Sequence, residues 1–280
     1  MEEQKKLSIM AIGAHPDDCD ICFGGTALKF KAQGHRVMFL SMTNGCSGHH
    51  LTPGPAMTAR RYGETQAVAK LTGIEYKMTD IPDGSLTNDL RYRDILMREI
   101  RAFKPDIILT HRPNDYHPDH RNTAVLVMDC SYLMIVPHVV PDSPPVKKRP
   151  YIFYFYDHFS FPGPFVPDIV VSIDDVMEQK ISMIACHKSQ FFEWIPYAEG
   201  ISGEVPPEED EEGRRQWLKK FLRENWEPPK TGKYREILDK RYVSALSGNE
   251  SGKTLDTEAF QLSEYGAQAT LEEMEKIFPL

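Results

Sequence analysis

Strand-length apolar runs alternate with longer segments in which apolar residues recur at helical spacing. The apolar runs are Leu7–Gly13, Arg36–Thr43, Ile74–Met78 and Asp106–Thr110. The segments with helical spacing are Ile21–Gln33, Thr58–Thr72, Leu90–Phe103 and Pro118–Ile135. Apolar runs that lack strict alternation are typical of strands buried on both faces. Four strands that alternate with helices predict an α/β fold with a Rossmann-like, doubly wound, mostly parallel sheet.

The second half of the chain has a less regular pattern. Tyr151–Tyr156 and Asp168–Ser172 have the length and composition of strands, and Glu204–Gly213 is strongly acidic. Such an acidic stretch is typical of a solvated loop. We therefore predict an α/β core over residues 1–195, which carries the site, and a C-terminal extension over residues 196–280. The extension is expected to pack on or near the core, with a role in specificity or in forming a homo-oligomer.

Composition and charge narrow the class of protein. A hydrophobic content of 41% among 280 residues predicts a folded chain rather than a disordered one. No apolar run approaches the roughly 20 residues of a membrane span, and the run after the first six residues is too short for a signal peptide. The net charge of −8 argues against general nucleic-acid binding. Five cysteines, an odd number, fit reduced thiols in a cytoplasmic protein.

Two segments rich in histidine and aspartate follow predicted strands. Ala14–Asp20 (AHPDDCD) comes directly after the first strand, and Tyr116–Arg121 (YHPDHR) follows the fourth. In doubly wound sheets, ligands bind outside the carboxyl ends of the strands. Either segment alone is typical of an ordinary polar loop, but two of them at one sheet edge favour a metal site.

The spacing of these residues suggests roles in metal-assisted catalysis. A catalytic zinc site takes three protein ligands and keeps one position for water. His15, Asp18 and His120 supply two imidazoles and one carboxylate. Asp17 is then free to act as the general base for the water and later as the acid for the leaving group. His117 is placed to stabilise an oxyanion.

Asp119 has the chemistry of a supporting carboxylate. Metal-binding histidines commonly donate their second ring nitrogen to such a group, and the candidates here are His117 and His120. Ligand type only biases the choice of metal, so Fe²⁺ or another divalent ion stays open beside Zn²⁺. His49 and His50 are interpreted as exposed loop residues, and Gly24–Gly25 as a weak signal for nucleotide binding.

These residues resemble the PIG-L/LmbE family of zinc-dependent N-deacetylases. The first family motif is matched by Ala14–Asp18 with Gly24–Thr26, and the second, H-P-D-H, by His117–His120. The resemblance extends from about residue 7 to residue 190. It implies the same roles as the spacing: His15, Asp18 and His120 bind zinc, Asp17 is base and acid, and His117 polarises the carbonyl.

The resemblance also reaches the predicted second helix and its neighbours. Arg60–Ile74 is similar to the family's R-x-x-E helix, which implies that Arg61 contacts the substrate. Asp20 departs from the family's commoner glutamate, which puts any supporting contact there in doubt. The acidic segment beyond residue 195 does not match, so the substrate stays open.

The function expected from motifs and resemblance is a zinc-dependent hydrolase. It would remove an acetyl or other acyl group from a small N-acetylated amino-sugar conjugate, using a metal-activated water and Asp17. Two alternatives stay open. One is a metal-dependent amidase acting on an N-acyl substrate that is not a sugar, and the other is a non-catalytic sugar-binding module of the same fold.

Overall fold

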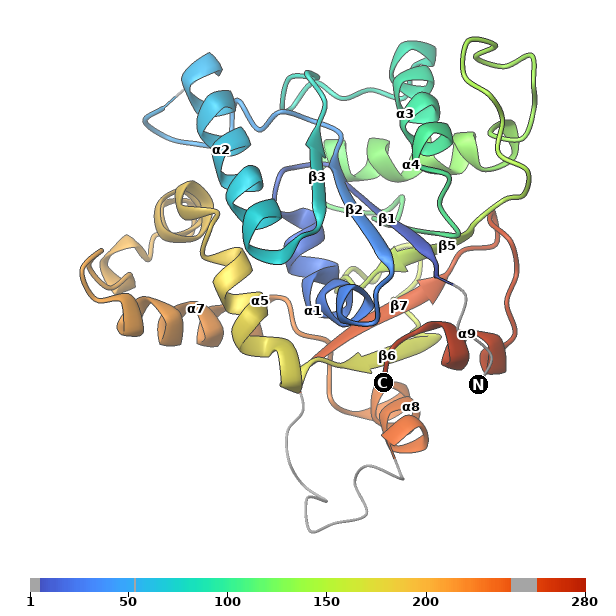
Figure 1. The fold of residues 1–280 in the computed structure, drawn as a ribbon. Coiled ribbons are helices and arrows are strands. Elements are labelled where there is room, and N and C mark those ends of the chain that lie inside the picture. Colours follow the sequence, from blue (N-terminus) through green and yellow to red (C-terminus); the bar gives the residue numbers. More distant parts are fainter. Residues whose placement is uncertain (1–5, 53, 243–255) are drawn as a thin grey trace.

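A seven-stranded sheet forms the centre of the molecule (Figure 1). The computed structural model describes residues 6–52, 54–242 and 256–280. The strand order is β3-β2-β1-β4-β5-β7-β6. The strands are β1 (Ser8–Gly13), β2 (Arg36–Ser41), β3 (Glu75–Met78), β4 (Ile107–Thr110), β5 (Tyr151–Phe155), β6 (Ile169–Ser172) and β7 (Thr257–Leu262). The predicted α/β, doubly wound fold is confirmed.

Strands β3, β2, β1, β4 and β5 pair in parallel, as the alternation with helices predicts. Strand β7 runs antiparallel to both of its neighbours, β5 and β6. It was not predicted, and it comes from the part of the chain expected to form an extension. A late segment is thus inserted into the sheet, while a division of the chain near residue 195 stays a prediction.

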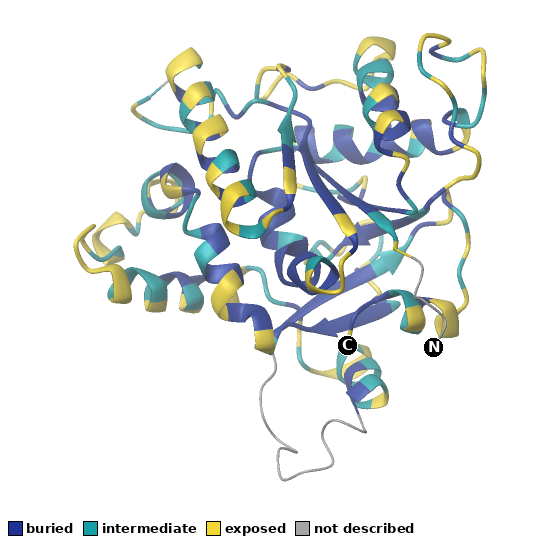
Figure 2. Ribbon diagram, viewed as in Figure 1, coloured by how far each residue is buried: buried dark blue, intermediate teal, exposed yellow. Residues whose placement is uncertain are grey.

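Alternate residues of each strand pack on opposite faces of the sheet. In β1, Ile9 and Ala11 join the core beneath α1 (Asp18–Ala32) and α5 (Met177–Ile184). Met10 and Ile12 join the core beneath the helices of the other face, α3 (Leu90–Phe103) and α4 (Pro118–Leu133). Figure 2 shows the consequence: the central strands are mostly buried, the edge strand β3 is partly exposed, and the helices expose mainly their outer sides. Both faces being covered explains the continuous apolar runs.

The remaining elements surround this framework. The other α-helices are α2 (Gly54–Thr72), α6 (Ile195–Ala198), α7 (Glu211–Asn225), α8 (Gly232–Tyr242) and α9 (Leu271–Ile277). The short elements are the 3₁₀-helices η1 (Asp174–Val176) and η3 (Ser202–Glu204) and the π-helix η2 (Gln190–Trp194). None of the helices in the described ranges combines the length and apolar content that crossing a bilayer requires.

The two helices that follow the motifs begin within the motifs themselves. Helix α1 begins at Asp18, three residues before the predicted start at Ile21, so Asp18 and Asp20 lie in its first turn and Asp17 is its N-cap. Helix α4 begins at Pro118, as predicted, with His117 as its N-cap. Proline is favoured at a first helical position because the missing N–H would have no helical partner there.

Candidate active site

The two motifs meet at the carboxyl edge of the sheet. Strands β1 and β4 are parallel neighbours, with Ile12 paired to Thr110, so the loops that leave them lie side by side. Gly13 ends β1 where the chain folds back tightly. A Cβ at this position would lie 2.7 Å from the Cβ of Asp18. Glycine is therefore needed for the close approach that places Asp18 next to the strand end.

The three predicted metal ligands come together. The Nδ1 atom of His15 lies 3.1 Å from the Nε2 atom of His120 and 3.5 Å from the Oδ2 atom of Asp18. The Nε2 atom of His120 lies 3.4 Å from the other carboxylate oxygen of Asp18. Among the described residues, overlapping groups able to hold a metal ion combine His15 and His120 with His117, and Asp18 and His120 with His111.

Asp18 is held rigidly in its ionised form. Its Oδ2 atom accepts hydrogen bonds from the backbone amides of Ala14 (2.8 Å) and His15 (2.7 Å). Burial opposes ionisation, but His120 and His111 outweigh it and hold the pKa of Asp18 well below its usual value. The carboxylate is therefore available to a cation without a proton being lost first.

His111 is a member of the site that sequence reasoning missed. Its Nε2 atom lies 3.1 Å from Oδ2 of Asp18, and its ring stacks on His120 with centroids 4.0 Å apart. With Asp18 and His120 it forms a second group able to hold a metal. Its place directly after β4 was the available signal, but that position is also typical of a residue that merely ends a strand.

Asp119 supports a different histidine from those predicted. Its Oδ2 atom lies 3.4 Å from Nε2 of His15, rather than against His117 or His120. Backbone amides of Gly84 and Leu86 donate to the same carboxylate, which is fully buried. The loop after β3 therefore fixes Asp119, and this loop packing could not be read from the motif.

Two further aspartates, in addition to Asp119, place carboxylates next to the candidate histidine ligands. Asp115 lies 3.1 Å from Nδ1 of His120, and Asp83 lies 3.3 Å from Nε2 of His15. Burial lowers the pKa of His120, but Asp18 and Asp115 raise it further, to about 9. Each candidate histidine ligand thus has its second nitrogen next to a carboxylate, as metal-binding histidines commonly do.

Asp17 lies buried beside Arg61. The Nη2 atom of Arg61 lies 3.1 Å from Oδ2 of Asp17, and the same guanidinium bonds the carbonyl of Pro16 and, at 2.8 Å, the carboxylate of Glu64. Arg61 is only 1% exposed. Burial raises the pKa of Asp17, with Arg61 opposing the shift. The arginine expected to contact substrate thus lines the cavity and is already paired with the proposed base and with Glu64.

His117 presents a proton to the site. Its Nδ1 atom accepts the backbone amide of Asp119 at 3.2 Å, as the N-cap of α4. An accepting Nδ1 places the proton of the neutral ring on Nε2. Burial, together with His15 and His120, lowers the pKa of His117. The ring is therefore a neutral donor, with its centroid 4.5 Å from that of His15.

Asp20 makes the contacts that anchor the first motif to the rest of the fold, although it is shorter than the family's usual glutamate. It is fully buried, 3.2 Å from Nε2 of His187, and accepts a hydrogen bond of 2.8 Å from the hydroxyl of Tyr76. These contacts join α1 to β3 and to the turn after α5. The departure from the family pattern is thus accommodated by neighbouring side chains.

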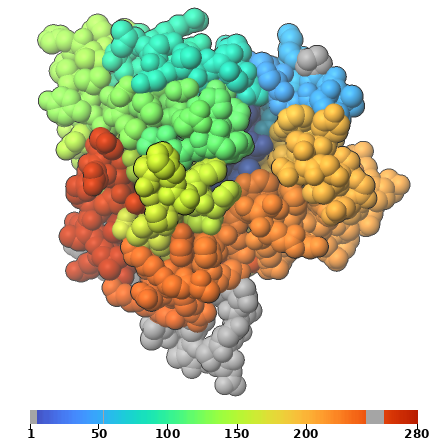
Figure 3. Space-filling view, turned by 180° about the vertical axis from the view of Figure 1, so that it is seen from behind, coloured from blue at the N-terminus to red at the C-terminus, as the bar shows by residue number. Residues whose placement is uncertain are grey.

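A cavity of about 540 Å³ opens over these residues. Figure 3 shows a hollow in which dark-blue atoms of the N-terminal part lie between green, yellow-green and orange segments. Later parts of the chain form much of its wall, including Tyr156–Phe159, Gln190, Trp194 and Trp226. A cavity of this size suits a small organic ligand.

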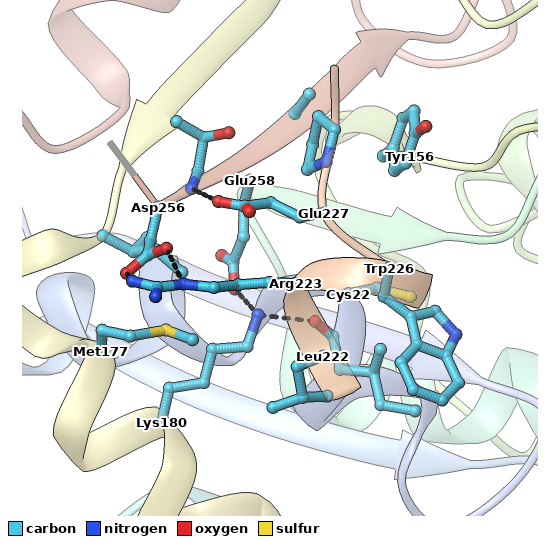
Figure 4. Close-up of a pocket in the computed structure, with 15 residues that line it drawn as sticks. Cys22, Tyr156, Met177, Lys180, Leu222, Arg223, Trp226, Glu227, Asp256 and Glu258 are labelled. Carbon is cyan, nitrogen blue, oxygen red and sulfur yellow. Dashed lines mark hydrogen bonds and ion pairs between the residues drawn. The ribbon is translucent and has the colours of Figure 1, made fainter. Parts of the chain in front are cut away.

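A second, smaller cavity of about 40 Å³ lies nearby and is structural (Figure 4). Lys180 lies at its centre and donates to Glu258 at 2.6 Å and to the carbonyl of Ile21 at 2.7 Å. Glu258 also accepts the backbone amides of Gly25 and Thr26, each at 2.8 Å. The glycine pair considered for nucleotide binding is therefore occupied by a side chain of this protein.

Comparison with known proteins agrees with the motifs. Residues 10–131 match the PIG-L family, described as GlcNAc-PI de-N-acetylase. Diacetylchitobiose deacetylase of Thermococcus kodakarensis is 28% identical over 214 residues, which are 69% of this chain and 76% of that protein. The resemblance drawn from the two motifs is thus confirmed, with the family match covering residues 10–131.

Solved structures share the fold. N,N'-diacetylchitobiose deacetylase from Pyrococcus horikoshii has a TM-score of 0.67 at 23% identity, covering 94% of this chain and 85% of that one. GalB, the 4-carboxy-2-hydroxymuconate hydratase from Pseudomonas putida KT2440, has a TM-score of 0.66 at 19% identity, covering 95% and 98%. Because these neighbours include a deacetylase and a hydratase, the fold alone does not decide the reaction.

Proposed function

We propose that this chain, whose residues 10–131 match the PIG-L family, is a zinc-dependent hydrolase that removes an N-acetyl group from an amino-sugar conjugate. The observation that carries the proposal is the convergence of His15, Asp18 and His120 below an open cavity, with a buried carboxylate, Asp17, beside them. The sequence match to an amino-sugar deacetylase supports the substrate class.

The donor set fits a tetrahedral zinc ion. Ligands about 2.0–2.1 Å from such an ion lie roughly 3.3 Å from one another. The imidazole nitrogens are 3.1 Å apart, and they lie 3.4 and 3.5 Å from the Oδ1 and Oδ2 atoms of Asp18 respectively, close to this spacing. Two imidazoles and one carboxylate are a usual set for catalytic zinc. A bound divalent metal supplies Lewis-acid polarisation of a carbonyl and lowers the pKa of a water.

The protein's own side chains divide the remaining work. Asp17 takes a proton from the attacking water and returns it to the leaving amine, and its raised pKa suits both steps. Arg61 keeps that carboxylate in place. His117 donates its Nε2 proton toward the developing oxyanion, which rests on the tautomer set by the Asp119 amide.

The structural similarity to a hydratase supports one rival reaction, the hydration of a double bond. A metal site and a carboxylate base of this kind also suit addition of water to a carbon–carbon double bond, as the name of GalB indicates for that protein. The sequence match favours amide hydrolysis, since the deacetylase of Thermococcus kodakarensis matches at higher identity than GalB.

The proposal is tested by measuring acetate release from N-acetylglucosamine and its glycosides with zinc-loaded protein. We expect release that stops on chelation and returns when zinc is added. An N-acyl amino acid and an unsaturated hydroxy acid serve as rival substrates. Turnover of either rival with no acetate from any sugar would overturn the proposal. Sugar binding without turnover would favour the binding module.

A further inference from the structure

A π-helix forms one wall of the large cavity and lies outside the PIG-L match. Helix η2 brings Gln190 and Trp194 to the cavity, and α6 continues the wall with Ile195, Ala198 and Glu199. π-Helices are rare and occur frequently at functional sites. This segment is therefore a candidate for a specificity element.

Side chains on both sides hold the π-helix in place. Gln190 donates to the carbonyl of Gly48 at 2.8 Å. Glu193 is paired with both terminal nitrogens of Arg60 and lies 2.9 Å from Nε2 of His49. The wall is therefore anchored to the loop after β2 and to α2, and the position of Trp194 beside it is restrained.

Trp194 is the cavity-facing member of an aromatic group. Its ring stacks on His50 at an interplanar angle of 25° and is tilted by 31° against Tyr197, with centroids 6.3 and 6.0 Å away. His50 and Tyr197 are themselves stacked, with centroids 3.8 Å apart. Because its neighbours are packed in this way, the indole offers a flat apolar surface at little cost in conformational entropy.

The charges around the cavity select against an anionic substituent. The described residues that line it include two arginines and no lysine. Arg61 is paired with Asp17 and Glu64, and Arg112 with Asp157 at 2.6 Å, so neither is free to bind a phosphate or carboxylate. Glu199 adds negative charge to the wall that Trp194 belongs to.

We infer that the substrate carries an uncharged second sugar ring, which stacks on Trp194 while Gln190 and Glu199 hydrogen-bond its hydroxyls. The inference deepens the proposed function and rests on it. A flat apolar face flanked by an amide and a carboxylate matches a sugar, which has an apolar C–H face and hydroxyls at its edge. A lipid tail would instead need a wall without these polar groups.

The test compares three acetylated substrates: N-acetylglucosamine, its β-linked disaccharide, and N-acetylglucosamine 1-phosphate. We expect kcat/KM for the disaccharide to exceed that for the monosaccharide about tenfold, as a single good pocket contact provides. The 1-phosphate should be the poorest of the three. In Trp194→Ala the disaccharide-to-monosaccharide ratio should fall to near one.

Trp217→Ala is the matched control. This tryptophan packs on Phe221, with centroids 4.9 Å apart, and does not line the cavity, so the substrate ratio should persist. A preference for the 1-phosphate, or an equal loss on both sugars in Trp194→Ala, would overturn the inference.

Binding separates this inference from the proposed function. Calorimetry on zinc-loaded Asp17→Asn measures disaccharide affinity without turnover, and we expect adding Trp194→Ala to weaken it about tenfold. If the disaccharide binds in a way that depends on Trp194 but the wild type releases no acetate, the proposed function is wrong and the sugar subsite is supported. If the affinity is the same with and without Trp194, the subsite is wrong.

Discussion

Two buried clusters of charged side chains contact the same helix, α1. They differ in whether their polar groups are fully paired within the protein. At the first turn, His15, Asp18 and His120 bring three ligand atoms toward one point beneath a 540 Å³ cavity. At mid-helix, Lys180 donates to Glu258 at 2.6 Å, beside a cavity of about 40 Å³. The first cluster gathers possible metal ligands, whereas the second pairs a cation with an anion.

The difference shows how a functional site can be distinguished from a structural ion pair when both consist of buried charged side chains. The Lys180–Glu258 cluster is complete by itself, because each charged group and the helix amides near it have partners. In the motif cluster, two imidazoles and a carboxylate from two distant segments converge beneath an open cavity, so a cation bound there would reach all three. Burial alone therefore does not identify a functional site, but converging donors do.

The largest expected effect is a loss of catalytic activity on substitution in the motif cluster. Asp17→Asn keeps the shape of the side chain and removes the base, so kcat for acetate release should fall about 10²–10⁴-fold. The folded structure should persist, since Arg61 keeps its bonds to Glu64 and to the Pro16 carbonyl. Circular dichroism and steady-state kinetics measure both. Activity within threefold of the wild type would assign the base elsewhere.

Lys180→Met should show the opposite behaviour. The change leaves the buried carboxylate of Glu258 without its cation, and the free energy of unfolding should fall by about 3–5 kcal/mol. Urea denaturation measures the loss, and the double variant with Glu258→Gln should recover part of it. The activity of the folded molecules should fall less than in Asp17→Asn. A stability close to that of the wild type would remove the distinction between the clusters.

Asp115→Asn probes the support behind a ligand. Asp115 lies 3.1 Å from the second ring nitrogen of His120, and losing this carboxylate should weaken zinc affinity about 10–100-fold. Competition with a chromogenic chelator measures the affinity. Asp129→Asn, on the outer part of α4, is the control and should bind zinc like the wild type. Equal affinities in all three proteins would show that Asp115 does not support the site.

The pH dependence of zinc binding follows from the same histidine. In the metal-free protein, the pKa of His120 is raised to about 9 by Asp18 and Asp115 against the effect of burial. A metal must displace that proton, so zinc affinity should fall as the pH is lowered from 9. Affinity measured at pH 8.5, 7.5 and 6.5 checks the direction. A constant affinity would contradict histidine ligation.

The smallest effect is expected at an exposed ion pair. Lys276 lies 2.6 Å from Glu272 on α9, and both side chains are more than 70% exposed. Solvent screens such a pair, so Lys276→Ala should leave the unfolding midpoint unchanged within error. A clear loss of stability here would show that ion pairing, rather than burial with a missing partner, accounts for the Lys180 result.

The positions of most strands, and the meeting of the two motifs at the strand ends, were predictable from the sequence. The strand that was missed has a local cause. Five parallel strands were found from apolar runs within one or two residues of their observed bounds. Strand β7 was missed because its sequence, TEAFQL, contains a glutamate that is buried only through its pairing with Lys180. A polar residue in a strand looks exposed until its distant partner is known.

Within the site, the ligands were easier to predict than their supports. His15, Asp18 and His120 stand close to strand ends, and neighbouring parallel strands bring their ends together. The partner of Asp119 depended on how the loop after β3 folds over α4, and His111 became part of the site through its stacking on His120. These contacts join segments whose spacing in the chain carries no signal.

By itself, the amino-acid sequence determined the parallel strands, their alternation with helices and the two motifs at the strand ends, because hydrophobic period and turn chemistry act over a few residues. Only the tertiary structure decided which carboxylate supports which histidine, that Arg61 pairs with Asp17, and that Trp194 lines the cavity. Those relations depend on the packing of side chains that lie far apart in the chain, and packing is resolved only when all segments occupy their places together.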